Sequence, residues 1–192
     1  TVGGDFTVSV TLRDDDGGAR TDEFLLTVIL ANVEFGAADF ADPEAAGGTL
    51  QLVRDNDTVV SQVRVAITGG TATAGVDYDD SIFPQVVTFD VGELTQTVSV
   101  PFFDNNVVEL DETITFEVTP VSNAALAEQN TTTLTIVNDE TAGLSIGDIS
   151  QAETDAGQTA YDFTLTATNP VDVDVTVDFS TADGTAVQAA AG

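Results

Sequence analysis

The chain has 192 residues, of which 33 are acidic and four are arginine, with no lysine or histidine, so its formal net charge is −29. Such a charge argues against nucleic acid or an anionic membrane as a partner, and it favours cations or an environment in which salt screens the repulsion. The absence of cysteine excludes disulfides and thiolate metal sites, while a hydrophobic content of 42% is sufficient for a folded core.

Residues 1–31 predict a β-hairpin. Hydrophobic and polar residues alternate over 6–12 and again over 24–30, on either side of the acidic, glycine-containing turn 14–18. Such alternation buries one face of a strand and exposes the other. We interpret this segment as the last two strands of a preceding domain, which cannot close a core by themselves.

From residue 32 onward the same period of two continues in short segments, separated by turns rich in glycine, asparagine and aspartate. The segments are 50–52, 63–67, 98–102, 114–118, 134–137 and 171–179. Only 124–128 looks helical, and it is short. Several short antiparallel strands with polar outer faces predict an all-β fold, an antiparallel β-sandwich.

Two landmarks recur at a spacing that suits one sandwich domain. The Gly-Thr-Ala triplet at 70–72 returns 114 residues later at 184–186, and Glu44 returns 109 residues later as Glu153. We therefore predict tandem repeats, and both ends of the chain look cut within a longer protein. The predicted division is the end of a preceding domain in 1–31, a complete unit in 32–140 and the start of a second unit in 141–192.

Acidic residues gather in the loops of the complete unit. The set comprises Glu44, Asp77, Asp79, Asp80, Asp104, Glu109, Asp111, Glu112 and the run Asn138-Asp139-Glu140. Alternate connections of an antiparallel sandwich lie at the same end. We therefore expect the loops that follow 98–103 and 131–137 to meet at one pole, within reach of Glu44 and Asp77.

Many carboxylates in a small volume repel one another unless a cation neutralises them. Calcium accepts roughly six to eight oxygen ligands in irregular geometry, which loops supply readily, whereas magnesium demands a near-octahedral arrangement. Zinc and copper would lack the histidine or cysteine that they prefer. The sequence therefore predicts bound calcium. The alternative is that these acids, above all Asp79, Asp80 and Asp111, are solvated loop residues.

Taken as an ordered set, several stretches resemble the Calx-beta domain family. They are Glu44 before the glycines at 47–48, the strand that ends at Arg54, the segment 70–78 with Gly-Thr-Ala and Asp-Tyr, Gly92-Glu93 with Gln96, Glu109 with Asp111-Glu112, and 136–139. The likeness covers 32–140 and resumes at 141–186, while 1–31 is similar to the tail of a cadherin-like bacterial repeat. It implies a seven-stranded immunoglobulin-like sandwich with calcium in its distal loops, as in the regulatory domains of sodium–calcium exchangers.

The resemblance also implies a set of calcium ligands. Carried over by position, they are the side chains of Glu44, Asp77, Asp104, Glu109, Glu112 and Asp139, the main-chain carbonyl of Val107, and Asn138 and Glu140 beside them. Asn105, Asn106 and Asn138 interrupt the acidic run of the exchanger pattern. Because amide oxygens carry no charge, we expect fewer or weaker ions than in a sensor domain.

The expected function is that of a calcium-binding structural or adhesion module in a large, repetitive, extracellular or cell-surface bacterial protein. Its expected partners are calcium, neighbouring domains of the same chain and a cell-surface or protein ligand. The alternative is a calcium-sensing regulatory domain of a membrane transporter. An enzyme is not expected, because the chain has no histidine, cysteine or tryptophan and two tyrosines. No apolar run approaches the about 18 residues that cross a bilayer, so we expect no membrane insertion of this segment.

Overall fold

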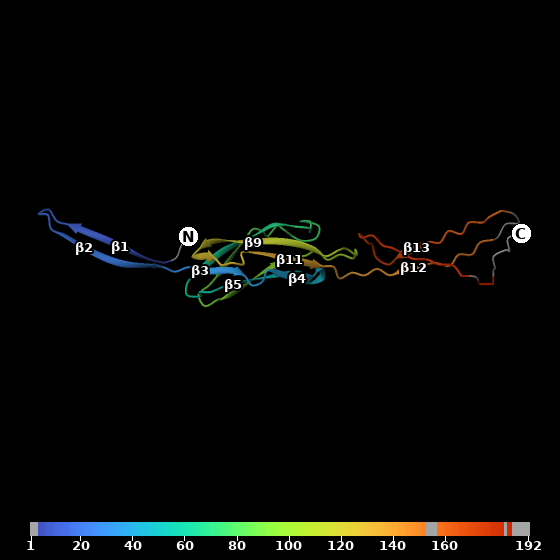
Figure 1. Ribbon diagram of the computed structural model, residues 1–192, viewed down its shortest axis with the longest axis horizontal. Helices are drawn as coiled ribbons and strands as arrows, with labels where there is room; N and C mark the ends of the chain where they lie inside the picture. The colour runs from blue at the N-terminus through green and yellow to red at the C-terminus, as the bar shows by residue number, and fades with distance from the viewer. Residues whose placement is uncertain (1–3, 153–156, 183, 186–192) are drawn as a thin grey trace. The chain divides into compact units, whose positions relative to one another are not determined.

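Figure 1 shows the computed structural model, which describes residues 4–152, 157–182, 184 and 185. Contacts divide the chain into two units, Thr1–Asn106 with Leu110–Glu140, and Val107–Glu109 with Thr141–Gly192. Glu153 and Ala186, which served as repeat landmarks, lie outside the described residues. Among the described residues no helix is both long and apolar enough to span a membrane.

Two sheets form the sandwich, one with the strand order β10-β3-β5-β8 and the other with the order β4-β11-β9-β6-β7. The elements are β3 (Ala31–Phe35), β4 (Asp39–Pro43), the 3-10 turn η1 (Glu44–Ala46), β5 (Gly48–Arg54), β6 (Ser61–Gly70), β7 (Gln85–Phe89), β8 (Thr95–Val100), β9 (Glu112–Ser122), β10 (Ala124–Leu126) and β11 (Thr131–Val137). The predicted all-β sandwich is confirmed.

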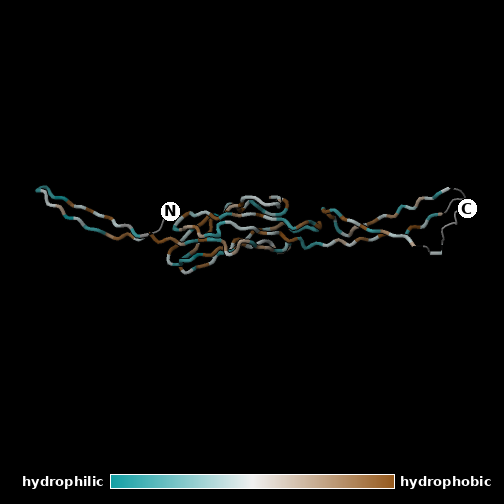
Figure 2. The backbone as a smooth tube through the Cα atoms, in the orientation of Figure 1, coloured by the Kyte–Doolittle hydropathy of each residue, from teal (hydrophilic) through white to brown (hydrophobic). Residues whose placement is uncertain are grey.

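The core lies between these sheets and follows the predicted alternation. Buried and more exposed residues alternate along β3, β5 and β11, and Figure 2 shows hydrophobic and hydrophilic stretches alternating along the strands. Phe35, Phe89 and Phe116 are among the largest fully buried side chains, and the ring of Tyr78 joins the same core. Burying a side chain of this size contributes about 1.5–3 kcal/mol, so this core is the main source of stability.

Two edge pairings are parallel, which the period of two did not predict. β10 runs parallel to β3, and β4 runs parallel to β11. The chain leaves one sheet at Phe35 and joins the other at Asp39. The buried hydroxyl of Thr132 lies 3.0 Å from the main-chain oxygens of both Ala37 and Ala38, so it holds this crossing against β11. The split first strand and the short β10 raise the expected seven strands to nine.

Glycine is required where β6 meets β9. Gly70 has φ of 133°, and a Cβ placed there would lie 2.0 Å from the main-chain oxygen of Thr113. Any other residue would therefore push β6 away from its neighbour. This contact explains why the Gly-Thr-Ala triplet begins with glycine.

Two local predictions were wrong. The stretch 124–128, expected to be helical, begins with β10, because the edge of β3 offers unpaired main-chain groups to a segment too short for a stable helix. The stretch 171–179, expected to be a strand, makes a β-bridge only at Val171 among the described residues. A strand needs a neighbour for its N–H and C=O groups, and the described residues supply none along 173–179.

The predicted hairpin is confirmed. β1 (Gly4–Arg13) and β2 (Ala19–Val28) pair along their whole length in antiparallel register. Their turn is closed by the N–H of Asp14, which donates to the main-chain oxygen of Gly18 at 3.0 Å, with Gly17 at φ 93°. The side chains of β2 are almost all exposed, because two strands alone cannot bury a face.

The second unit holds one described strand pair, β12 (Leu144–Ile146) with β13 (Leu165–Ala167), in antiparallel register. All six of these residues are exposed. The division of the chain into 1–31, 32–140 and 141–192 stays a prediction.

A buried arginine closes the end of the sandwich at which β5 ends. Arg54 is 5% exposed, and its guanidinium donates to the main-chain oxygens of Glu93 and Asp90 at 2.5 Å and of Val59 at 2.6 Å. The same group lies 5.1 Å from the ring centroid of Phe89. These bonds tie two loops, the β5–β6 loop with Val59 and the β7–β8 loop with Asp90 and Glu93, to one side chain.

We expect Arg54→Met to destabilise the chain by about 2–4 kcal/mol, because three partly buried hydrogen bonds to main-chain oxygens are lost together. Arg64→Met is the matched control, since Arg64 is exposed on β6, and it should change the free energy of unfolding by no more than about 0.5 kcal/mol. Urea unfolding followed by circular dichroism measures both. Equal effects of the two substitutions would contradict the structural role of Arg54.

Candidate metal centre

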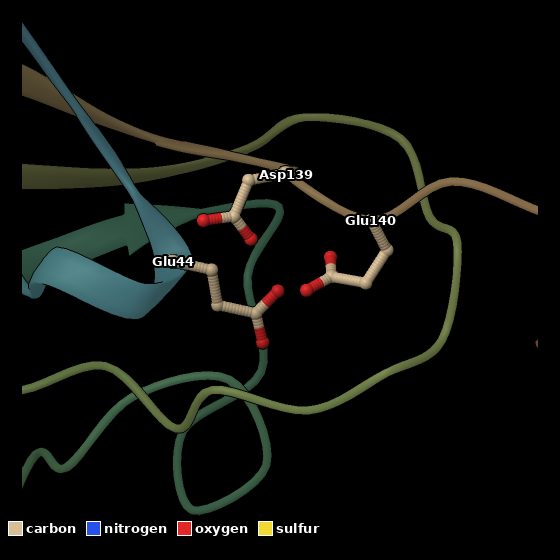
Figure 3. A group of neighbouring side chains, drawn as sticks. All are labelled: Glu44, Asp139 and Glu140. Carbon is tan, nitrogen blue, oxygen red and sulfur yellow. The ribbon is translucent and has the colours of Figure 1, made fainter.

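Three carboxylates converge where β4 and β11 end. Glu44 opens η1 directly after β4, and Asp139 and Glu140 follow β11. One oxygen from each residue lies within 4.8 Å of the others. Figure 3 shows the three side chains pointing toward one another. We call this group the carboxylate triad.

The parallel pairing of β4 with β11 brings the triad together. Val137 lies opposite Pro43, the last residue of β4. Because parallel strands run in the same direction, both end at the same edge, and the residues that follow each strand emerge side by side. An antiparallel pairing would have sent Glu44 to the other end of β11. The predicted meeting of Glu44 with Asp139 is correct, and the parallel pairing of β4 with β11 is its reason.

A third segment reaches the triad from β8. Gly48 pairs with Val100, so the loop after β8 passes beside η1. In that loop the Asn105 side-chain amide donates to Oε1 of Glu44 at 2.8 Å. Glu44 is only 5% exposed, so a nearly buried carboxylate relies on protein donors or on a cation in place of water.

The side chain of Glu140 gives the clearest indication of a cation site. Its Oε2 atom is buried and has no hydrogen-bond partner among the described residues. Burial in the first place, and the neighbouring Asp139 carboxylate in the second, raise the pKa of Glu140 above its ordinary value. A buried carboxylate oxygen without a donor is costly, and a bound cation would satisfy it.

Other predicted ligands lie outside the triad. The Asp77 carboxylate accepts the N–H of Thr73 at 2.5 Å and so closes its own turn. Asp104 is exposed, and Glu112 is half-buried at the start of β9, beside the end of β11. Among the described residues, none of these carboxylates belongs to the group whose oxygens lie within 4.8 Å of one another.

Val107 and Glu109 fall in the second unit by their contacts, and both are half-buried. Between them, the Val108 N–H donates to the main-chain oxygen of Pro170 at 2.9 Å, and its oxygen accepts the N–H of Asp172 at 3.0 Å. The part of these residues in metal binding stays a prediction, as does the whole set of ligands.

Two of the acids for which the sequence favoured a solvated loop position have defined contacts. The Asp79 carboxylate accepts the N–H of Ser81 at 2.9 Å, and its bonds to Ser81 lower the pKa of Asp79. Asp111 is exposed, yet its Oδ1 accepts the N–H of Asn138 at 3.1 Å. The sequence carries no signal for this second bond, because it depends on how β9 and β11 are paired.

Burial, followed by the charges of Asp80 and Asp77, raises the pKa of Tyr78.

The donor set of the triad and its surroundings consists of carboxylate and amide groups. Such oxygen ligands suit hard cations, and an irregular loop arrangement suits calcium better than magnesium. The fold and this acidic end together define an immunoglobulin-like β-sandwich module with a candidate cation site.

The chain belongs to the Calx-beta domain family. The model of that family, the Calx-beta domain, matches residues 33–140 and again residues 143–191. The family resemblance is thereby confirmed, and the two successive matches support tandem repeats. Calx-beta domains are calcium-binding and regulatory modules.

Several solved structures share the fold. The apo form of the Calx CBD1 domain is 22% identical with a TM-score of 0.50, and the match covers 58% of this chain and 99% of that one. The calcium binding domain CBD12 of CALX1.1 is 24% identical with a TM-score of 0.50, covering 57% of this chain and 45% of that one. CBD12 from CALX1.2 is 23% identical with a TM-score of 0.50, covering 57% and 46%. Comparison with the curated proteins found no match.

At these identities the likeness shows the fold alone. This chain spans less than half the length of the two CBD12 structures.

We expect Glu140→Gln to raise the melting temperature of the chain at pH 7 when divalent cations are removed, because it takes one charge out of the triad. A raised pKa in the folded state means that ionised Glu140 opposes folding. This penalty is present above the raised pKa and disappears as the pH falls below the ordinary value of 4.5. The advantage of the variant should therefore shrink toward pH 4. Thermal melts in EDTA across this range measure the difference.

Glu117→Gln is the control for that prediction. Glu117 is exposed on β9 and pairs with Thr131, at the far end of β11 from the triad. An equal rise in melting temperature for both variants would show that net charge, and not the triad, causes the effect.

Proposed function

We propose that the carboxylate triad binds a calcium ion. The observation that carries this proposal is the buried Oε2 of Glu140, which has no hydrogen-bond donor among the described residues although it lies in a group of three carboxylates. A divalent cation would neutralise most of the triad's charge and coordinate that oxygen. Membership of the Calx-beta family supports the choice of calcium.

The triad would supply part of the site, with further ligands as the family resemblance implies them. We propose Asp77, Asp104, the Val107 carbonyl, Glu109, Glu112 and Asn138 as this wider set. The side-chain amide of Asn105 donates a hydrogen bond to Oε1 of Glu44. Calcium that binds this oxygen would have to displace that hydrogen bond. The asparagines also lower the charge of the loops, so we propose fewer or weaker ions than in a domain with an unbroken acidic run.

We further propose that the chain is a structural or adhesion module of a repetitive extracellular protein, without catalytic activity. The successive family matches support a repeated domain organisation, with neighbouring domains as partners. A chain with a net charge of −29 and no cysteine fits a secreted, cation-rich setting. The second candidate is a calcium-sensing regulatory domain of a membrane transporter, which membership of the Calx-beta family supports, because that family includes regulatory modules.

Calcium should stabilise the wild-type chain. A ligand at about 1,000 times its Kd stabilises the folded state by about 4.1 kcal/mol, so millimolar calcium should raise the melting temperature measurably if the Kd is micromolar. Glu44→Gln should lose most of this rise, whereas Glu117→Gln should keep it. Scanning calorimetry with calcium, with magnesium and with EDTA makes the comparison. The absence of any calcium effect on the wild-type chain would refute the site.

Location separates the two candidate functions. We expect antibodies against this chain to label the surface of intact cells of the source organism. The same antibodies should also detect the protein in the culture medium. Labelling that requires permeabilised cells, together with recovery in the membrane fraction, would favour the transporter. The measurement is immunofluorescence before and after permeabilisation, with a cytosolic protein as the control.

A further inference from the structure

We propose that Asp111 is a positioning residue that directs the carboxylates of Asp139 and Glu140 toward the cation without binding the cation itself. This inference rests on the proposed calcium site. Asp111 immediately precedes β9, and its Oδ1 accepts the N–H of Asn138 at 3.1 Å. Asn138 in turn immediately precedes Asp139.

The hydrogen bond between Asn138 and Asp111 lies where the main-chain hydrogen bonding of β9 with β11 would otherwise continue. The pairing of β9 with β11 runs as far as Ile136 opposite Glu112. In antiparallel register, the ladder would continue with Val137 opposite Asp111 and then with Asn138 opposite Leu110. The side chain of Asp111 accepts the Asn138 N–H instead. A carboxylate acceptor makes a stronger bond than a carbonyl, and this bond lies just beyond the last pair of β9 and β11, next to the residues Asp139 and Glu140.

The three residues after β11 are then fixed from two sides. On one side Val137 is held against Pro43 of β4. On the other side Asp111 holds Asn138, whose side-chain amide donates to the main-chain oxygen of Glu140 at 3.0 Å. Ligands must be held within about 0.5 Å of a productive geometry to bind well. Loss of the Asp111 bond would release one of the two supports.

Asp111 does not behave as a member of the triad. It is exposed, and its carboxylate is outside the group within 4.8 Å among the described residues. A positioning role needs only a hydrogen-bond acceptor, which asparagine also provides, whereas a role through charge needs the carboxylate. Asparagine and alanine at this position therefore distinguish the two roles.

The test is isothermal titration of calcium into the full chain for the wild type, Asp111→Asn, Asp111→Ala and Glu117→Gln. Loss of a supporting hydrogen bond behind a metal ligand weakens affinity by about 10–100-fold. We expect Asp111→Ala to fall in this range, Asp111→Asn to stay within about threefold of the wild type, and Glu117→Gln to match the wild type. A melt in EDTA checks that each variant is folded.

Two outcomes would overturn the positioning role. Either Asp111→Ala binds calcium as tightly as the wild type, or Asp111→Asn is as weak as Asp111→Ala, which would mean that the charge acts directly. Amide hydrogen exchange adds a measurement that does not depend on the alanine variant. The Asn138 N–H should be protected in the wild type and in Asp111→Asn, and rapid exchange in the wild type would also overturn the role. A wild-type chain that binds no calcium would instead refute the site on which this inference rests.

Discussion

The parallel pairing of β4 with β11 is the constraint on which the acidic end of the sandwich depends. Parallel neighbours end at the same edge, so Glu44 and the residues after Val137 meet although more than ninety positions separate them in the sequence. That pairing in turn depends on the crossing between the sheets, which the buried Thr132 hydroxyl holds in place. A single hydroxyl therefore contributes to the geometry of a charged site without touching it.

The core and the triad act in opposite directions on stability. The buried phenylalanines and leucines between the sheets favour the folded chain, whereas the converging carboxylates oppose it through mutual repulsion and lost hydration. The core supplies the free energy that keeps Glu44, Asp139 and Glu140 together when no cation is bound. Under the proposed function, cation binding would become folding free energy, and it would couple the local stability of this end to the composition of the solvent.

The period of two predicted what depends on side-chain burial, namely the sandwich, its core and the loop positions of Glu44 and Asp139. It could not predict the features that depend on which strands are neighbours in a sheet. The parallel edge of β4, the strand at Ala124–Leu126 and the hydrogen bond of Asp111 each require knowledge of which strand lies beside which. The expected strand at 171–179 was wrong for the same reason, since hydrophobic alternation permits a strand and a neighbour completes it.

The two ends of the sandwich differ in how their charged side chains are compensated. At one end the charge of Arg54 is satisfied within the chain, by main-chain oxygens from two loops and by the Phe89 ring. At the other end the triad would need positive charge, and a chain with four arginines and no lysine has little to give. Monovalent salt only screens such a group, whereas one divalent ion brings two charges and several coordination positions to a single point. If the triad binds calcium as proposed, neutralisation of this end would therefore come from solution.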